Sequence, residues 1–127
     1  MFSLENVKIT NEKSITWEHS DILVVKEFNL PIFQIIFSKL INSVIIIADY
    51  REVGSNNMYL YNLDGTLKVN PCVPALTKSI QGIYSMWYVE GHEEQTVVLI
   101  TGENTPYETK CIFNLKDYSF SKFSPTK

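Results

Sequence analysis

The chain has 127 residues, 45% of them hydrophobic and 20% charged, and its net charge is −3, with 14 acidic residues against 11 basic ones. This composition predicts a single β domain over residues 1–127 and excludes disorder for most of the chain, because the apolar residues suffice for a core. It also argues against nucleic-acid binding, which normally requires a basic stripe with several arginines, whereas Arg51 is the sole arginine.

The first half of the chain reads as strands, because β-branched and aromatic residues are plentiful and alanine is scarce. Residues 7–10 and 14–17 form a predicted hairpin, and residues 22–25 are either another short strand or a connector. Asp64 and Gly65 are expected to close a second hairpin, since this dipeptide supplies the positive φ of a tight turn. The strands that flank this turn are expected at 58–63 and 66–69. Two earlier strands are expected at 29–40 and 43–48, followed by a loop at 49–56.

The second half begins with a connector at 70–81, where Pro71 and Pro74 break strand pairing and residues 75–80 have the pattern of one helical turn. Strands are then expected at 83–90, 95–100, 108–115 and 118–123. The longest apolar runs, at 44–48 and 97–100, are too short to span a bilayer. The N-terminus lacks a signal-peptide pattern. We therefore expect a cytoplasmic protein.

Residues 43–65 and 95–117 carry the same apolar pattern at an offset of 52 residues. In this alignment Ile46 falls on Val98 and Tyr61 falls on Phe113. The unbroken apolar run 44–47 predicts a strand covered on both faces. Together these features predict an all-β, open, half-propeller-like stack of antiparallel four-stranded sheets with about two and a half repeats. The partial repeat covers 7–17, and the full repeats cover 31–69 and 83–123.

The sequence offers no motif for catalysis, a cofactor or a metal. His19 and His92 lie far apart, and neither has a second His or Cys at ligand spacing. No phosphate-binding glycine loop occurs. Cys111 lies in an alternating strand, which favours a small core hydrophobe over a nucleophile. We therefore predict a protein that is not an enzyme and that needs no cofactor and no metal.

Acidic residues gather in the predicted loops, and residues 49–52 and 101–103 occupy corresponding positions in the two repeats. Because equivalent loops emerge on the same side of stacked sheets, we expect one acidic edge, which is either a solvated loop face or a docking surface for a basic protein. Trp87 and Tyr88 are further candidate anchors. The candidate partner-binding residues are Asp49, Tyr50, Glu52, Glu90, Glu93, Glu94, Glu103 and Tyr107.

Residues 59–67, Tyr-Leu-Tyr-Asn-Leu-Asp-Gly-Thr-Leu, resemble the aromatic-x-Tyr-Asp-x-x-Gly-x-Leu hairpin of small propeller-like bacterial proteins, with Asn62 in place of the usual Asp. Residues 7–17 resemble a degenerate copy that ends in Trp17. A small acidic chain with such hairpins is similar to immunity proteins of bacterial contact-dependent growth inhibition systems. The resemblance implies stoichiometric binding and neutralisation of a cognate toxin, often a basic nuclease, with charge complementarity guiding association.

Two other functions remain open at this stage. An enzyme on a small β scaffold would need a cluster of titratable residues, which the sequence does not reveal. A structural or ligand-binding β module, acting as a subunit of a larger assembly, would use open sheet edges to pair with another chain. The sequence leaves open which face binds, what the partner is and whether the chain forms oligomers.

Overall fold

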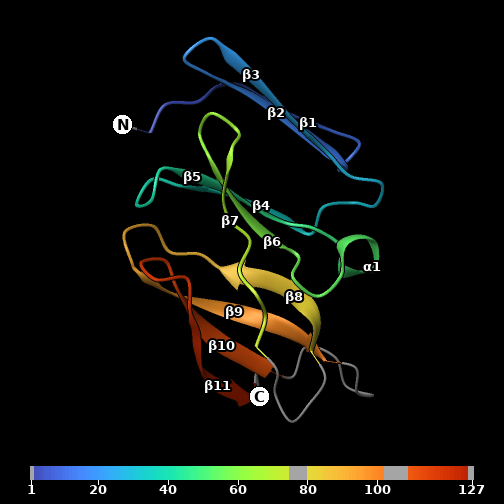
Figure 1. Ribbon diagram of the computed structural model, residues 1–127, viewed down its shortest axis with the longest axis vertical. Coiled ribbons are helices and arrows are strands. Elements are labelled where there is room, and N and C mark those ends of the chain that lie inside the picture. Colours follow the sequence, from blue (N-terminus) through green and yellow to red (C-terminus); the bar gives the residue numbers. More distant parts are fainter. Residues whose placement is uncertain (1, 75–79, 102–108, 126–127) are drawn as a thin grey trace.

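The computed structural model describes residues 2–74, 80–101 and 109–125, and these form an all-β fold of three antiparallel sheets, none of them closed (Figure 1). In each sheet the strands lie side by side in chain order. Sheet A contains β1 (Glu5–Thr10), β2 (Ser14–His19) and β3 (Ile22–Glu27). Sheet B contains β4 (Gln34–Ser38), β5 (Ser43–Ile47), β6 (Met58–Asn62) and β7 (Leu67–Val69). Sheet C contains β8 (Ile80–Trp87), β9 (Glu94–Thr101), β10 (Thr109–Asn114) and β11 (Phe120–Pro125).

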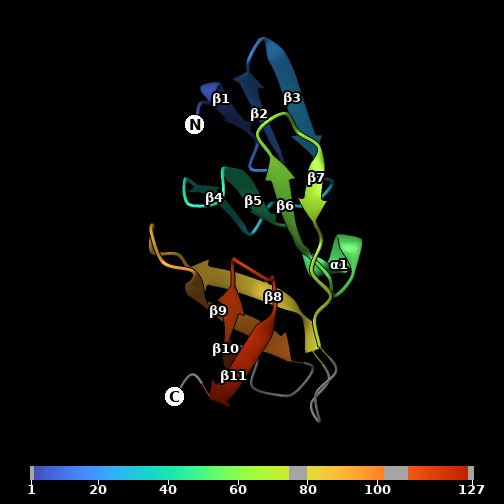
Figure 2. The ribbon, with the colours of Figure 1, turned by 60° about the vertical axis from the view of Figure 1, so that its left-hand side comes forward.

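The three sheets are layered along the long axis, with sheet B in the middle (Figures 1 and 2). Ile15 and Trp17 of sheet A pack with Val44 and Ile46 of sheet B in one core cluster. On the other face of sheet B, residues such as Ile45 belong to a second cluster shared with sheet C. All five residues of β5 are buried. The prediction that this apolar run is covered on both faces is therefore confirmed.

Residues that the sequence pattern aligns lie on like strands of sheets B and C. Ile46 and Val98 lie on the second strand of their sheets, and Tyr61 and Phe113 lie on the third. The side chains of Trp17, Ile46, Val98 and Phe113 are buried. Tyr61 is half-buried, with the Lys26 ammonium 4.1 Å from its ring centroid.

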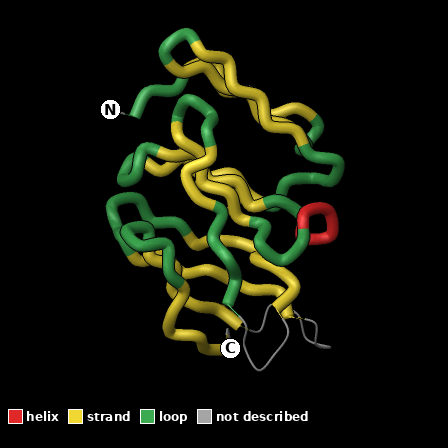
Figure 3. The backbone as a smooth tube through the Cα atoms, viewed as in Figure 1, coloured by secondary structure: helices red, strands yellow, loops and turns green. Residues whose placement is uncertain are grey.

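Two local expectations differ from the structure. The predicted partial repeat ends at residue 17, but β3 adds a further strand and makes sheet A three-stranded. The predicted loop 49–56 contains a short helix, α1 (Tyr50–Val53), which is drawn red in Figure 3. The Asp49 carboxylate caps this helix by accepting the Arg51 backbone N–H, and Gly54 ends it at φ +91°. Of the predicted helical turn at 75–80, residues 75–79 lie outside the described residues, and Ile80 begins β8.

Two amide side chains, those of Gln34 on β4 and of Asn57 just before β6, join sheet B to the edge strand β8 of sheet C. Asn57 donates to the carbonyls of Ala48 (2.7 Å) and Ile83 (2.8 Å) and accepts the Ile83 N–H (2.7 Å). Gln34 donates to the Met86 carbonyl (2.9 Å) and accepts the Met86 N–H (2.7 Å). An edge strand otherwise leaves such groups unpaired. The two amides therefore hold sheets B and C together and protect this edge.

Candidate functional site

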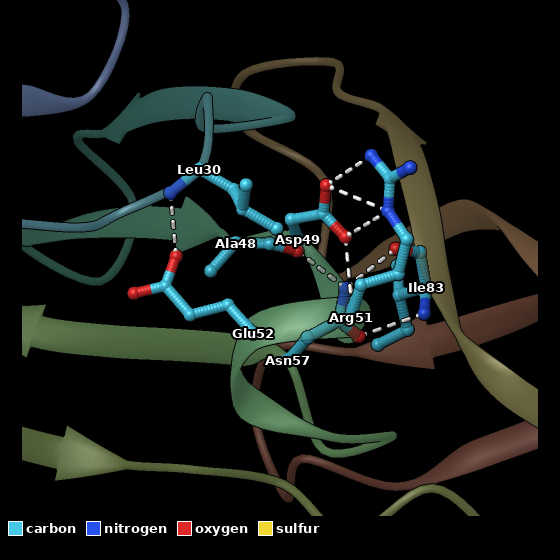
Figure 4. A network of polar contacts seen from close by, with 7 residues as sticks. All are labelled: Leu30, Ala48, Asp49, Arg51, Glu52, Asn57 and Ile83. Carbon is cyan, nitrogen blue, oxygen red and sulfur yellow. Dashed lines mark hydrogen bonds and ion pairs between the residues drawn. The ribbon is translucent and has the colours of Figure 1, made fainter.

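The first group of predicted site residues surrounds α1 (Figure 4). Asp49 is buried, and its carboxylate accepts hydrogen bonds from Arg51 Nη2 (2.6 Å), Arg51 Nε (3.0 Å) and the Arg51 backbone (2.8 Å). These bonds, the side-chain ones above all, hold the pKa of Asp49 below its usual value. Tyr50 is half-buried and packs its ring against that of Phe33, with centroids 6.3 Å apart. Asp49 and Tyr50 therefore stabilise the fold and are poorly placed to meet a partner.

Glu52 and Glu90 bind backbone amides of distant segments. Glu52 accepts the N–H groups of Asn29 and Leu30, both at 2.8 Å, and so fixes the segment that leads from sheet A to sheet B. Glu90 accepts the N–H groups of Lys39 (2.7 Å) and Leu40 (3.1 Å) in the β4–β5 turn. Burial alone would raise the pKa of Glu90, but these hydrogen bonds keep it below its ordinary value. Both carboxylates act as intramolecular clamps.

The predicted residues do not gather on one surface. Asp49, Tyr50 and Glu52 lie at α1, whereas Glu90, Glu93 and Glu94 lie at the β8–β9 hairpin, and the two places are at opposite ends of the sheets in Figures 1 and 2. The other two candidates, Glu103 and Tyr107, lie outside the described residues.

The β8–β9 hairpin is held in a fixed shape by Gln95, whose side chain is buried. Gln95 Oε1 accepts the Val89 N–H, and Nε2 donates to the carbonyls of Val89 and His92, all at 2.8 Å. The Glu93 carbonyl also accepts the Leu115 N–H at 2.7 Å. The side chains of Glu93 and Glu94 remain exposed. Glu94 lies 3.8 Å from Lys122, an exposed pair that contributes little to stability.

Exposed apolar side chains lie next to these acids. Trp87 and Val89 are 54% and 55% exposed. Trp87 pairs with Thr96, and alternation along β9 places Glu94 on the same outer face of sheet C as Thr96. Of the two aromatic anchors expected in this segment, Trp87 is on the surface, but Tyr88 is half-buried with its hydroxyl 2.6 Å from that of Ser38. We call Trp87, Val89, Glu93 and Glu94 the hairpin surface.

Val89 was not identified from the sequence as a surface residue, because an apolar residue at the end of a predicted strand is usually assigned to the core. A sequence signal did exist for Asp49: Asp49 and Glu52 have the Asp-x-x-Glu spacing of a helix N-terminus, which would have predicted a structural role.

A polar cleft of about 390 Å³ lies between the ends of sheets A and B. Lys68 Nζ donates to the Ile41 carbonyl at 2.5 Å, and burial lowers the pKa of Lys68. Asp64 accepts the N–H and hydroxyl of Thr66, which lower its pKa. The Nδ1 atom of His19 lies 2.7 Å from the Ser3 carbonyl oxygen. These contacts tie the polar side chains of the cleft to backbone and turn groups. It is lined by His19, Ile41, Asn42, Asn62, Leu63, Asp64 and Lys68.

Comparisons with known protein families, with curated proteins and with solved structures found no match for this chain. Among the described residues, no three His, Cys, Asp or Glu side chains come together in a group able to hold a metal ion. In the same residues, no helix is both long enough and apolar enough to cross a bilayer. The hairpin surface is thus the strongest candidate site that the described residues offer.

Proposed function

We propose that this protein is an immunity protein of a bacterial toxin–immunity system, of the contact-dependent growth inhibition type, that neutralises a basic cognate toxin by binding it one to one. The fold that goes with this proposal is a half-propeller-like stack with about two and a half repeats. The observation that carries the proposal is the hairpin surface, where two exposed carboxylates, an exposed tryptophan and an exposed valine belong to one hairpin whose turn has a fixed shape.

Each part of the hairpin surface contributes differently to such binding. A turn that is already ordered loses little conformational entropy on association, so more of the contact free energy appears as affinity. Trp87 supplies the kind of large aromatic anchor that dominates protein interfaces. Glu93 and Glu94 attract a basic surface and speed the encounter, helped by the net charge of −3. The toxin class that fits is a cationic protein, such as a nuclease whose active site is lined with Lys and Arg.

Growth rescue tests this proposal directly. A candidate basic toxin domain, chosen from the genomic neighbourhood of this gene, is induced in a sensitive bacterium, with wild-type protein or with the variant Trp87→Ala supplied from a second plasmid. We expect the wild type to restore growth and to co-purify with the toxin domain, and we expect Trp87→Ala to lose most of the rescue. Leu23→Ala, at an exposed apolar residue of sheet A, is the matched control and should rescue fully. Growth arrest despite soluble wild-type protein would refute the proposed function.

A further inference from the structure

Sheet A lacks one strand that sheets B and C possess. Sheets B and C each have four strands in chain order, and sheet A has three. The last strand of sheet A leads directly into β4, as β7 leads into β8, so β3 takes the place of a fourth strand. By the same comparison, β2 corresponds to the third strand of sheets B and C, and β1 corresponds to their second strand. The place of a first strand, beside β1, is empty among the described residues.

Apolar side chains on both sides of this empty place are left uncovered. Ile9 pairs with Ile15 of the core and therefore faces sheet B, yet it is 53% exposed, and Val7 on the same strand is 44% exposed. On sheet B, Phe37 pairs with Val44 and therefore faces sheet A, yet it is 36% exposed. Side chains that point between two sheets are normally buried. We call the space between β1 and β4 the β1 groove.

The β1 groove also contains a hollow of about 270 Å³. Its lining is mainly apolar, formed by Ile9, Ile32, Phe33 and Ile35 together with Glu12 and Gln34. The free edge of β1 adds the backbone N–H and C=O groups that an edge strand presents. Apolar walls, an open hollow and an unpaired edge are the features that bind an added strand.

Lys8 determines what kind of strand fits. It lies at the middle of the free edge, between Val7 and Ile9, and pairs with Thr16 on the outer face. If two copies of β1 paired antiparallel in the register centred on Lys8, this residue would stand directly opposite Lys8 of the other copy. Like charges in that position destabilise the pair. A second copy of the chain is therefore disfavoured, and a strand with an acidic residue at this position is favoured.

We propose that the β1 groove binds an extended segment of a partner protein as the missing strand of sheet A, with an acidic side chain opposite Lys8 and apolar side chains on either side of it. This inference does not depend on the proposed toxin, because it concerns a different face and a segment of opposite charge. The recognition is through backbone hydrogen bonds and the apolar walls of the β1 groove, with Lys8 setting the charge preference.

A synthetic peptide with the core Thr-Val-Glu-Val-Thr is the probe, and its binding is followed through the backbone amide resonances of the full chain. We expect saturable shifts at residues 7–10 and around the hollow. A peptide with lysine in place of the glutamate should bind roughly fivefold to tenfold more weakly, since an attractive cross-strand pair becomes a repulsive one. Lys8→Glu should reverse this order. Ile9→Asn should abolish binding, whereas Leu23→Asn, at an exposed position on the outer face, should not.

Three results would overturn the inference. The first is that the glutamate and lysine peptides bind equally or not at all. The second is that a peptide N-methylated on alternate amides binds as well as the parent, because strand pairing needs those N–H groups. The third is concentration-dependent dimerisation of the wild type that Ile9→Asn removes, which would make a second copy the occupant.

Discussion

Acidic side chains that look alike in the sequence have two different roles in this molecule. Asp49, Glu52 and Glu90 accept hydrogen bonds from defined donors and hold segments in place, whereas Glu93 and Glu94 face solvent. The sequence carries a capping signal for Asp49, but it could not reveal the roles of Glu52 and Glu90, because their donors are backbone groups that reach them only in the folded chain. The two roles lead to opposite expectations for stability and for binding.

Asp49→Asn tests the structural role. Because the folded-state pKa of Asp49 lies below its usual value, the carboxylate stabilises the native state above a pH of about 4, and that contribution is lost as the pH falls through the folded pKa. The variant should therefore be less stable than the wild type near pH 7, and the difference should shrink in acid. Urea unfolding from pH 7 to pH 3 measures this, with exposed Asp21→Asn as control. A difference that does not change with pH would contradict the assigned role.

The two cysteines should differ sharply in reactivity. Burial raises the pKa of the Cys111 thiol to about 12, so the reactive thiolate is essentially absent at neutral pH, whereas Cys72 is exposed. A maleimide reagent should label one thiol per native molecule and two after denaturation, and Cys72→Ser should leave no native label. Rapid labelling of both thiols in the native protein would place Cys111 at the surface.

Phe113→Ala should lower the free energy of unfolding by roughly 3–5 kcal/mol, because it opens a cavity in the core between sheets B and C. Phe37→Ala makes the same change at a partly exposed site and should cost much less. Urea denaturation gives both values. A loss below about 1 kcal/mol for Phe113→Ala would show that the side chain is not in the core and would contradict the strand register of β10.

At the scale of elements, the amide clamps of Gln34 and Asn57 are what fix sheet C against sheet B. Asn57→Ala removes three buried hydrogen bonds and leaves backbone groups of Ala48 and Ile83 unpaired, so a loss of about 2–4 kcal/mol is expected. Asn62→Ala, whose amide reaches only the Thr66 hydroxyl at the surface, should cost less than about 1 kcal/mol. Equal unfolding midpoints for the two variants would show that the clamps contribute little.

Gly82 completes the same joint. A Cβ atom at this position would lie 2.7 Å from Cβ of Tyr50 and 3.1 Å from Oδ1 of Asn57, so the close approach of β8 to α1 requires glycine. Its role is in packing and not in a turn, which a sequence alone does not reveal.

Element type and strand order were predictable because they depend on local patterns. Alternation and turn residues located the hairpins, and the Asp64-Gly65 turn has its expected positive φ at Gly65. The unbroken apolar run of β5 correctly indicated a middle sheet. The strand β3 was left open as a strand or a connector, because it alternates weakly, and the short helix α1 was missed, because it is only four residues long.

The candidate site was only partly predictable. Trp87, Glu93 and Glu94 were identified from the sequence. The hydrogen bonds that Glu90 accepts from backbone amides, and those by which Gln95 fixes the turn, form only on folding and could not be predicted. The list of candidate partner-binding residues combined residues from the two ends of the sheets. The 52-residue offset between the repeats predicts which loops are equivalent. It does not reveal which carboxylates already accept hydrogen bonds within the fold.

For the whole molecule, three layered sheets present the hairpin surface at one end of sheet C and the β1 groove between sheets A and B. The double variant Glu93→Lys/Glu94→Lys should keep the stability of the wild type within about 0.5 kcal/mol, since both side chains are exposed. The matched change Asp49→Lys/Glu52→Lys should instead destabilise the fold, because it removes the cap of α1 and the clamp on residues 29–30.

The most direct test of the proposed function is the rate at which the protein associates with the toxin domain used for growth rescue, measured by stopped flow as ionic strength increases. We predict that the wild-type rate falls steeply with salt, and that Glu93→Lys/Glu94→Lys associates roughly tenfold or more slowly at low salt with a flatter salt dependence. If the double variant associates at the wild-type rate and with the wild-type salt dependence, docking through the hairpin surface is contradicted.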